Sequence, residues 1–286
     1  MLIMILSTLY SVFSELFKIS PPGLVPFVAP VFQSSSLAST YKNEFFATLI
    51  MIGLTFAPGK WIAVTQPKTV VWAVHALTVI AADVLGGGQH VNPAMTLAMV
   101  SMNKCTGGLS EAYTRISGQM AGGLISFPLF HLFSSSFHLN SLGGPDYARV
   151  SDNNVSAVAL LARNEFFATF WLCIAVCVLN FQCNFGKYHY WVKQTMTAVI
   201  IRVLIETFST TGPAMNPMLG TAWSVFAYGS FPTYTSHYFI YWISSILGAL
   251  VGALIYTLYA GGIFCGKQIK GLKSSKQVAP VKKKKQ

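Results

Sequence analysis

Charge is scarce in this chain, because only 9% of its 286 residues are charged and just eight are acidic. Hydrophobic residues make up 53%, so the charges present are too few to cover the surface of a water-soluble protein. The sequence also lacks a CxxC pair, a metal-ligand spacing among its histidines, a phosphate-binding loop and a nucleophile motif. We therefore expect no metal, no other cofactor and no enzyme. The five cysteines are scattered and odd in number, which favours free, buried thiols.

Long apolar runs are what the chain does have, and they predict an all-α integral membrane protein. A helix needs about 20 apolar residues to cross a bilayer. Six such spans are expected near residues 43–63, 69–87, 110–133, 164–182, 191–210 and 236–262. Two further apolar pieces, 88–104 and 211–228, are interrupted by Gly and Pro and are too short to cross.

The positive charge is concentrated at the C-terminal end. The formal net charge is +11, but residues 266–286 contain eight lysines and no acid, which leaves +3 for the rest. Such a tail favours a solvated end that touches anionic lipid, and nucleic-acid binding is disfavoured because no folded basic module accompanies it. The final Lys283-Lys284-Lys285-Gln286 also resembles the dilysine retrieval signal of endoplasmic-reticulum membrane proteins.

Loop charges indicate the orientation in the membrane. If the termini are cytosolic, twelve basic residues lie on the cytosolic side and four on the other side, as the positive-inside rule requires. The twelve are the eight tail lysines with Lys104, Arg115, Lys187 and Lys193, and the four are Lys60, Lys68, Arg149 and Arg163. This topology places the N-glycosylation sequon that begins at Asn154 on the lumenal or external side. The N-terminal extension, residues 1–41, leaves three alternatives open: a cleaved targeting peptide, an interfacial helix or a loose extension.

An internal repeat organises the rest of the chain. The hexapeptide NEFFAT occurs at residues 43–48 and 164–169, an offset of 121, and Asn92-Pro93-Ala94 is matched by Asn216-Pro217-Met218 at an offset of 124. The chain thus divides into a first repeat at 42–133, a loop at 134–163, a second repeat at 164–263 and the basic tail at 264–286. Because each repeat has three spans, the second enters the membrane from the opposite side.

Each Asn-Pro pair is suited to begin a helix. Proline has no N–H to lose in the first turn, and asparagine is a favourable cap. We therefore expect half-helices at 93–104 and 217–228 that enter from opposite faces and meet at their N-termini, in a water-lined constriction. One Asn-Pro alone would favour a simple turn, but two copies in matching repeats disfavour it.

At these residues the chain resembles a known family. The segments GGGQHVNPAMTL and TGPAMNPMLGTAW are similar to the two signature loops of the aquaporins, or major intrinsic proteins, and the similarity runs from about Lys42 to Gly262. TGPAMNP, HYFIYWISSILGALVGAL and the lysine-rich end resemble the small basic intrinsic proteins, a plant and algal branch of internal membranes. The resemblance implies an aquaporin-like fold of six spans plus two re-entrant half-helices, a homotetramer, and passage of water or a small neutral solute.

The resemblance also implies roles for the repeated acids. Glu44 and Glu165, the glutamates of NEFFAT, would brace the two re-entrant loops by hydrogen bonding. The alternative is that each acid snorkels from a helix end into water.

The family's outer selectivity filter falls on positions that carry no cation here, namely Trp72, Leu204, Pro213 and Leu219, where Leu219 takes the place of the usual arginine. Water, glycerol, urea and hydrogen peroxide all remain candidate solutes. Met218 replaces the usual alanine of the second signature, and its size motivates an alternative function, a structural or interaction protein with a nearly closed pore. An active antiporter is disfavoured because few acids line the presumed path.

Four further polar residues lie in or beside the expected spans. His90 and Asp83 are expected at the pore mouth, where Asp83 could attract cations, although a solvated helix end is the favoured interpretation. Arg202 and Glu206 are four residues apart in one span, and we expect them to pair with each other.

Overall fold

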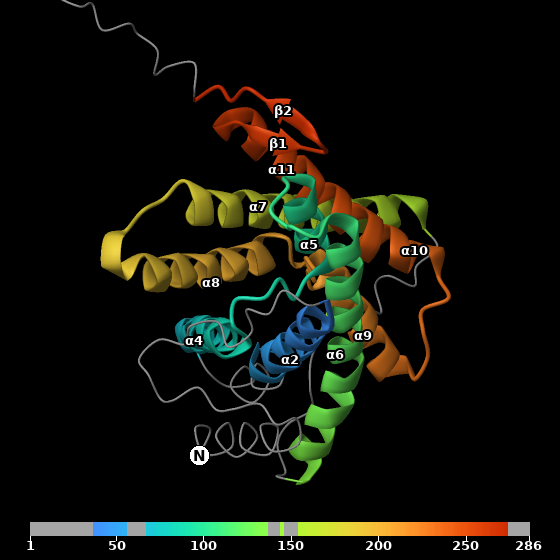
Figure 1. Cartoon of the computed structure of the whole chain (residues 1–286). Coiled ribbons are helices and arrows are strands. Elements are labelled where there is room, and N and C mark those ends of the chain that lie inside the picture. Colours follow the sequence, from blue (N-terminus) through green and yellow to red (C-terminus); the bar gives the residue numbers. More distant parts are fainter. Residues whose placement is uncertain (1–36, 56–66, 137–143, 146–153, 274–286) are drawn as a thin grey trace, which may run out of the picture.

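The structure is a computed structural model that describes residues 37–55, 67–136, 144–145 and 154–273, and these are almost entirely helical (Figure 1). The first half contains α2 (Leu37–Thr55), α4 (Lys68–Gly86), α5 (Pro93–Ser101) and α6 (Gly108–Ser136). The second half contains α7 (Val155–Phe181), η2 (Gly186–Tyr188), α8 (His189–Thr207), η3 (Ser209–Thr211), α9 (Pro217–Tyr228), α10 (Thr235–His237), the π-helix η4 (Tyr238–Ser244) and α11 (Ser245–Ala260). Two short strands follow, β1 (Gly262–Phe264) and β2 (Lys267–Ile269).

Most expected helices are present, and two of them begin earlier than the sequence indicated. Helix α7 begins at Val155 rather than near residue 164, because the Asn154 side chain accepts hydrogen bonds from the N–H groups of Ser156 and Ala157 and caps the helix there. Helix α2 likewise begins at Leu37, inside the expected N-terminal extension. Residues 1–36, most of the loop after α6 and the end of the lysine tail lie outside the described residues.

Equivalent helices pack together in the two halves. Helix α2 packs against α6, and α7 packs against α11. At both contacts a glycine lets the backbones approach closely. A Cβ added at Gly122 would lie 2.5 Å from the carbonyl oxygen of Phe45, and one added at Gly248 would lie 2.3 Å from that of Phe166. Phe45 and Phe166 are the same position of the repeated hexapeptide, so these contacts are repeat equivalents.

By length and composition, two helical stretches of the described chain qualify as membrane spans, Val155–Phe181 and Thr235–Ala260. Trp72–Gly86 is also apolar but shorter. Helix α8 is less apolar because it carries Lys193, Arg202 and Glu206.

The beginning of the expected basic tail is folded. Strands β1 and β2 form an antiparallel hairpin that directly follows α11 (Figure 1). The Cys265 N–H at its turn donates to the Ser101 carbonyl oxygen at 2.7 Å, so the hairpin is tied to the C-terminal end of α5. The sequence interpretation of the basic end as disordered is therefore wrong for residues 264–269, which are largely exposed but ordered, with a Cys265-Gly266 turn of positive φ that closes the hairpin.

Candidate functional site

The two half-helices begin at the two repeated asparagines. Asn92 has an extended backbone, and its side-chain oxygen accepts hydrogen bonds from the N–H groups of Ala94 and Met95. Asn216 has the same conformation and accepts from Met218 and Leu219. Pro93 and Pro217 occupy the first helical positions. The sequence predicted both helix starts, and Pro217–Tyr228 also has the predicted end, whereas Pro93–Ser101 ends three residues early.

The two asparagines are joined by a reciprocal exchange of hydrogen bonds. The Asn92 side-chain amide donates to the Met215 carbonyl oxygen at 2.7 Å, and the Asn216 amide donates to the Val91 carbonyl oxygen at 2.8 Å. An amide NH₂ has two hydrogens. Among the described residues, each of these amides therefore keeps one hydrogen without a protein acceptor. The arrangement brings together two helix N-termini, each with a partial positive charge of about half a unit.

The residues that accept these bonds have a strained backbone. Val91 and Met215 have φ values of 48° and 49°, in the left-handed region that non-glycine residues rarely adopt. Such a conformation costs about 1–3 kcal/mol and persists only where the surroundings impose it. Here each residue is fixed through its carbonyl by the opposite asparagine and through its N–H by a glutamate.

The first of these glutamates, Glu44, is fully buried and accepts four hydrogen bonds. The backbone N–H groups of His90 and Val91 donate at 3.1 and 2.9 Å. Arg115 Nη1 donates at 2.6 Å and Gln119 Nε2 at 3.0 Å. The buried charge of Glu44 is thus neutralised by a cation, and its carboxylate fixes the backbone before Asn92.

The second glutamate, Glu165, occupies the equivalent place without a cation. It accepts from the backbone N–H groups of Ala214 and Met215 at 2.8 and 3.0 Å. The hydroxyls of Thr211 and Ser245 donate at 2.9 and 3.4 Å. Each carboxylate oxygen therefore accepts one backbone N–H, as in the first half, but hydroxyls replace the arginine and the glutamine.

The two polar residues expected at the mouth have protein partners. The His90 ring lies 3.2 Å from the Thr96 hydroxyl in the first turn of α5. Asp83 accepts a hydrogen bond from the Tyr190 hydroxyl at 2.7 Å and another from the Gln194 amide. These contacts join α4 to α8, which lie side by side (Figure 1). Asp83 is partly exposed and is also bonded to a neighbouring helix, and its place at a pore mouth stays a prediction.

Sequence reasoning did not find the partners of the buried acids. Arg115 and Gln119 lie four residues apart in one helix, and this spacing could have indicated a shared polar face. Tyr190 and Gln194 show the same spacing on α8. The expected pair of Arg202 and Glu206 is confirmed by a contact of 2.7 Å.

Comparison with known proteins identifies the family. The family model described as major intrinsic protein matches residues 31–256, which is most of the chain. The chain belongs to the major intrinsic protein family. Among curated relatives it is similar to Aquaporin SIP1-1 of Arabidopsis thaliana, with 25% identity over 209 residues that cover 72% of this chain and 82% of the relative.

A solved structure supports the fold of this major intrinsic protein. The X-ray structure of the aquaglyceroporin from Plasmodium falciparum matches with a TM-score of 0.57 and 20% identity, covering 77% of this chain and 96% of that one. The helical architecture is thus that of an aquaporin, and the chain is an integral membrane protein of a channel family.

The four positions expected to form the family's outer filter are dispersed among several elements. Trp72 lies near the start of α4 and is half-buried, and Pro213 is buried in the connection before α9. Leu204, in the last turn of α8, packs with Met215, whereas Leu219, in the first turn of α9, packs in a separate apolar cluster. The assignment of these four residues to one filter remains a prediction.

The side chain of Met218 packs against α6. Met218 is fully buried, and a Cβ added at Gly123 in α6 would lie only 2.2 Å from its sulfur. The thioether therefore fills space that the missing side chain of Gly123 leaves open between α9 and α6. The alternative of a nearly closed pore, which Met218 and the apolar filter motivate, stays a hypothesis.

The prediction of free, buried thiols is confirmed for three cysteines and is wrong for Cys265, which is exposed. The structure records the five cysteines as free, and Cys105, Cys173 and Cys177 are buried. Within the described residues, no group of three or more His, Cys, Asp or Glu side chains could hold a metal ion.

Proposed function

We propose that this protein is a passive channel for water and small uncharged solutes, with one pore per subunit. Six spans and two re-entrant half-helices in an inverted 3+3 repeat would form the pore. The observation that carries the proposal is the reciprocal hydrogen-bond exchange between the two half-helix starts at Asn92 and Asn216. It places two helix N-termini together, each supported by a buried glutamate.

The geometry suits neutral permeants. One amide hydrogen on each asparagine has no acceptor among the described residues, so it can donate to a water or hydroxyl oxygen that passes between the helices. The positive ends of the two helix dipoles oppose cations at the same point. Met218 and Ala94 follow the two prolines, and the Met218 thioether packs against Gly123 of α6.

An outer filter of Trp72, Leu204, Pro213 and Leu219 would carry no cation. A filter arginine donates hydrogen bonds and repels positive charge, so its replacement by leucine would relax selectivity among neutral solutes. Glycerol, urea and hydrogen peroxide are therefore proposed permeants beside water. Glu44 and Glu165 would brace the loops and would not take part in transport.

The decisive experiment is stopped-flow light scattering on proteoliposomes under osmotic and solute gradients. A channel raises the permeability to water or to at least one neutral solute above that of empty vesicles. Permeability equal to that of empty vesicles for water, glycerol, urea and peroxide would overturn the proposal. Leu219→Arg should lower solute permeability relative to water permeability, whereas the neutral control Leu219→Met should keep the wild-type ratio.

We propose cytosolic termini, a homotetramer and residence in an internal membrane such as the endoplasmic reticulum, with lipid contacts made by the lysine tail. The charge distribution and the resemblance support these assignments.

In this orientation Asn154 is lumenal. Endoglycosidase treatment should shift the wild-type band and leave Asn154→Gln unshifted. Glycosylation of a sequon introduced into the C-terminal tail would contradict the topology.

A further inference from the structure

Tyr241, in the π-helix η4, contacts the loop before α9, residues 208–216, through its hydroxyl. The hydroxyl donates to the Thr211 carbonyl oxygen at 3.1 Å. The Tyr241 ring packs against α9 itself, because a Cβ added at Gly220 would lie 2.7 Å from the Cγ of the ring. The whole side chain is buried. One tyrosine therefore joins η4 both to the loop that leads to Asn216 and to the half-helix that follows it.

Tyr241 occupies the position that Arg115 has in the first half. The equivalent glycines at the close helix contacts set the offset between α6 and α11 at 126 residues, which is 248 minus 122. The same offset relates Arg115 to Tyr241. It also relates Gln119 to Ser245, and each of these two donates to the Oε2 atom of the buried glutamate in its own half. The shared contact supports the alignment of the two helices.

Arg115 and Tyr241 make corresponding contacts with different chemistry. Arg115 donates to the buried glutamate of its half at 2.6 Å and to the side chain of Gln89, in the loop before α5, at 3.0 Å. Tyr241 donates to the Thr211 carbonyl, and the Thr211 hydroxyl donates in turn to the glutamate of the second half at 2.9 Å. Each residue thus ties its helix to a loop and to a glutamate, by a cation in the first half and by neutral hydrogen bonds in the second.

The bond to Thr211 lies beside a point where the backbone can pivot. Gly212 follows with a φ of 55°, a conformation that glycine adopts without steric cost. Its N–H donates within the loop, to the Ser209 carbonyl oxygen at 3.2 Å. Pro213 comes next and has no N–H by which another helix could hold it. The Thr211 carbonyl is therefore the place at which Tyr241 can fix the direction of the chain into Pro213.

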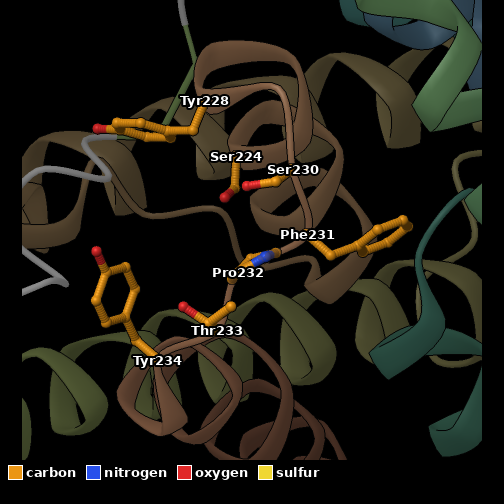
Figure 2. A pocket seen from close by; sticks show the side chains of 7 residues that line it. All are labelled: Ser224, Tyr228, Ser230, Phe231, Pro232, Thr233 and Tyr234. Carbon is orange, nitrogen blue, oxygen red and sulfur yellow. The ribbon is translucent and has the colours of Figure 1, made fainter.

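The start of η4 is held as well, so the position of Tyr241 is defined. The chain returns from α9 to α10 through residues 230–234, which line a small pocket with the end of α9 (Figure 2). The Tyr238 hydroxyl donates to the Pro232 carbonyl oxygen of this connection at 3.0 Å. Tyr238 is the first residue of the π-helix and lies three residues before Tyr241. Short π-helical segments are frequent at functional sites.

We propose that Tyr241 is the positioning residue of the loop before α9, as Arg115 is of the loop before α5. Its hydroxyl sets the place of Pro213, and through Pro213 the ratio of solute to water permeability. The second part rests on the proposed channel function and on the place of Pro213 in the outer filter.

Hydrogen–deuterium exchange on the full-length protein in detergent tests the positioning role without any transport. Tyr241→Phe removes the hydroxyl and keeps the ring that packs on α9. We expect the backbone amides of residues 209–216 to exchange about 3- to 10-fold faster, the factor of a typical net hydrogen bond. Those of residues 87–92 should keep the wild-type rate, because Arg115 is unchanged.

The matched control is Tyr238→Phe, which loses a hydroxyl of the same π-helix that bonds to Pro232 instead. It should leave the exchange of both loops unchanged. A wild-type exchange rate in residues 209–216 of Tyr241→Phe would overturn the proposal. Equal acceleration in both loops would also overturn it, because a general loss of stability would then explain the effect.

Stopped-flow measurements on proteoliposomes test the role in specificity. The ratio of glycerol to water permeability should rise in Tyr241→Phe by a similar factor, about 3-fold or more, because a loop that is held less firmly excludes the larger solute less strictly. Tyr238→Phe should keep the wild-type ratio. Faster exchange without a rise in this ratio would overturn the role in specificity. Wild-type vesicles that conduct neither water nor glycerol would overturn the channel proposal instead, and the exchange experiment would still decide the positioning role.

Discussion

The contact between Met218 and Gly123 supports a double-variant test of how the pore tolerates a methionine beside its central asparagine. In Met218→Ala, the buried thioether leaves a cavity between α9 and α6, and such truncations cost about 2–5 kcal/mol. In Gly123→Ala, the new Cβ would lie 2.2 Å from the Met218 sulfur and 3.1 Å from its Cγ. This overpacking costs about 1–3 kcal/mol, offset by about 1 kcal/mol from the better helix propensity of alanine.

The double variant should be more stable than the two single effects predict. With both changes, the methyl group at position 123 occupies part of the space that the thioether vacates, and no clash remains. We expect a coupling free energy of about 1–3 kcal/mol between the two sites. It can be measured by reversible unfolding with sodium dodecyl sulfate in mixed micelles. Water permeability should fall in Gly123→Ala, where the displaced thioether can move only by disturbing the start of α9, and should recover in the double variant.

The control for this cycle is Gly53→Ala combined with Met218→Ala. Gly53 also sits under a large side chain, because its Cβ would lie 2.1 Å from the Phe130 ring, but its partner is a different residue. That pair of changes should be closer to additive. Additivity within about 0.5 kcal/mol for Gly123 and Met218 would show that the two residues do not share one space and would refute the reasoning.

Three further outcomes are expected. Glu44→Gln should lower the free energy of unfolding by about 3 kcal/mol because it removes one of the two carboxylates that pair with Arg115 and leaves only Glu111 opposite the guanidinium. Glu165→Gln places an amide NH₂ against a backbone N–H and should lower the free energy of unfolding by only about 1–3 kcal/mol. If detergent melting curves show that Glu165→Gln costs as much as Glu44→Gln or more, this reasoning is contradicted. Maleimide at pH 7 should label exposed Cys265 quickly and Cys105 slowly, because burial raises the pKa of the Cys105 thiol to about 11 and only the thiolate reacts. In the folded protein, the labelling rate of Cys105 should increase as the pH rises toward about 11. Equal labelling rates of Cys105 and Cys265 at pH 7, measured by peptide mass spectrometry, would show that this reasoning is wrong. Asp83→Ala should lower the melting temperature more than Asp83→Asn, because asparagine keeps the oxygen that accepts from α8; identical melting temperatures would exclude the hydrogen bonds as the cause.

Local chemistry made the half-helices predictable from the sequence. An asparagine that caps and a proline that lacks an N–H determine where a helix begins, whatever packs around it. The start of α7 was missed for a related reason. Asn154 was interpreted as part of a glycosylation sequon, although the same side chain also caps the helix that follows. The hairpin after α11 was not predicted because its strands are only three residues long. The second strand also belongs, by composition, to the lysine-rich end of the chain.

Contacts between distant residues could not be predicted in this way. The two glutamates were expected to brace the loops, but nothing in the sequence assigns Arg115 to Glu44 and Ser245 to Glu165, since these pairs are 71 and 80 residues apart. The sequence also could not show where the Met218 side chain packs, because the gap at Gly123 arises only when α6 packs on α9.

The reciprocal bonds between the asparagines also set an order of events during synthesis. The acceptor of the Asn92 amide is the carbonyl of Met215, which lies 123 residues further along the chain. A ribosome that adds about 5–20 residues per second needs roughly 6–25 s to make that stretch. Throughout this interval Asn92 has been synthesised but the residue that accepts its amide hydrogen has not. Until then, water or the insertion machinery must satisfy this amide, so the segment before α5 reaches its final contacts only after the second half has been made.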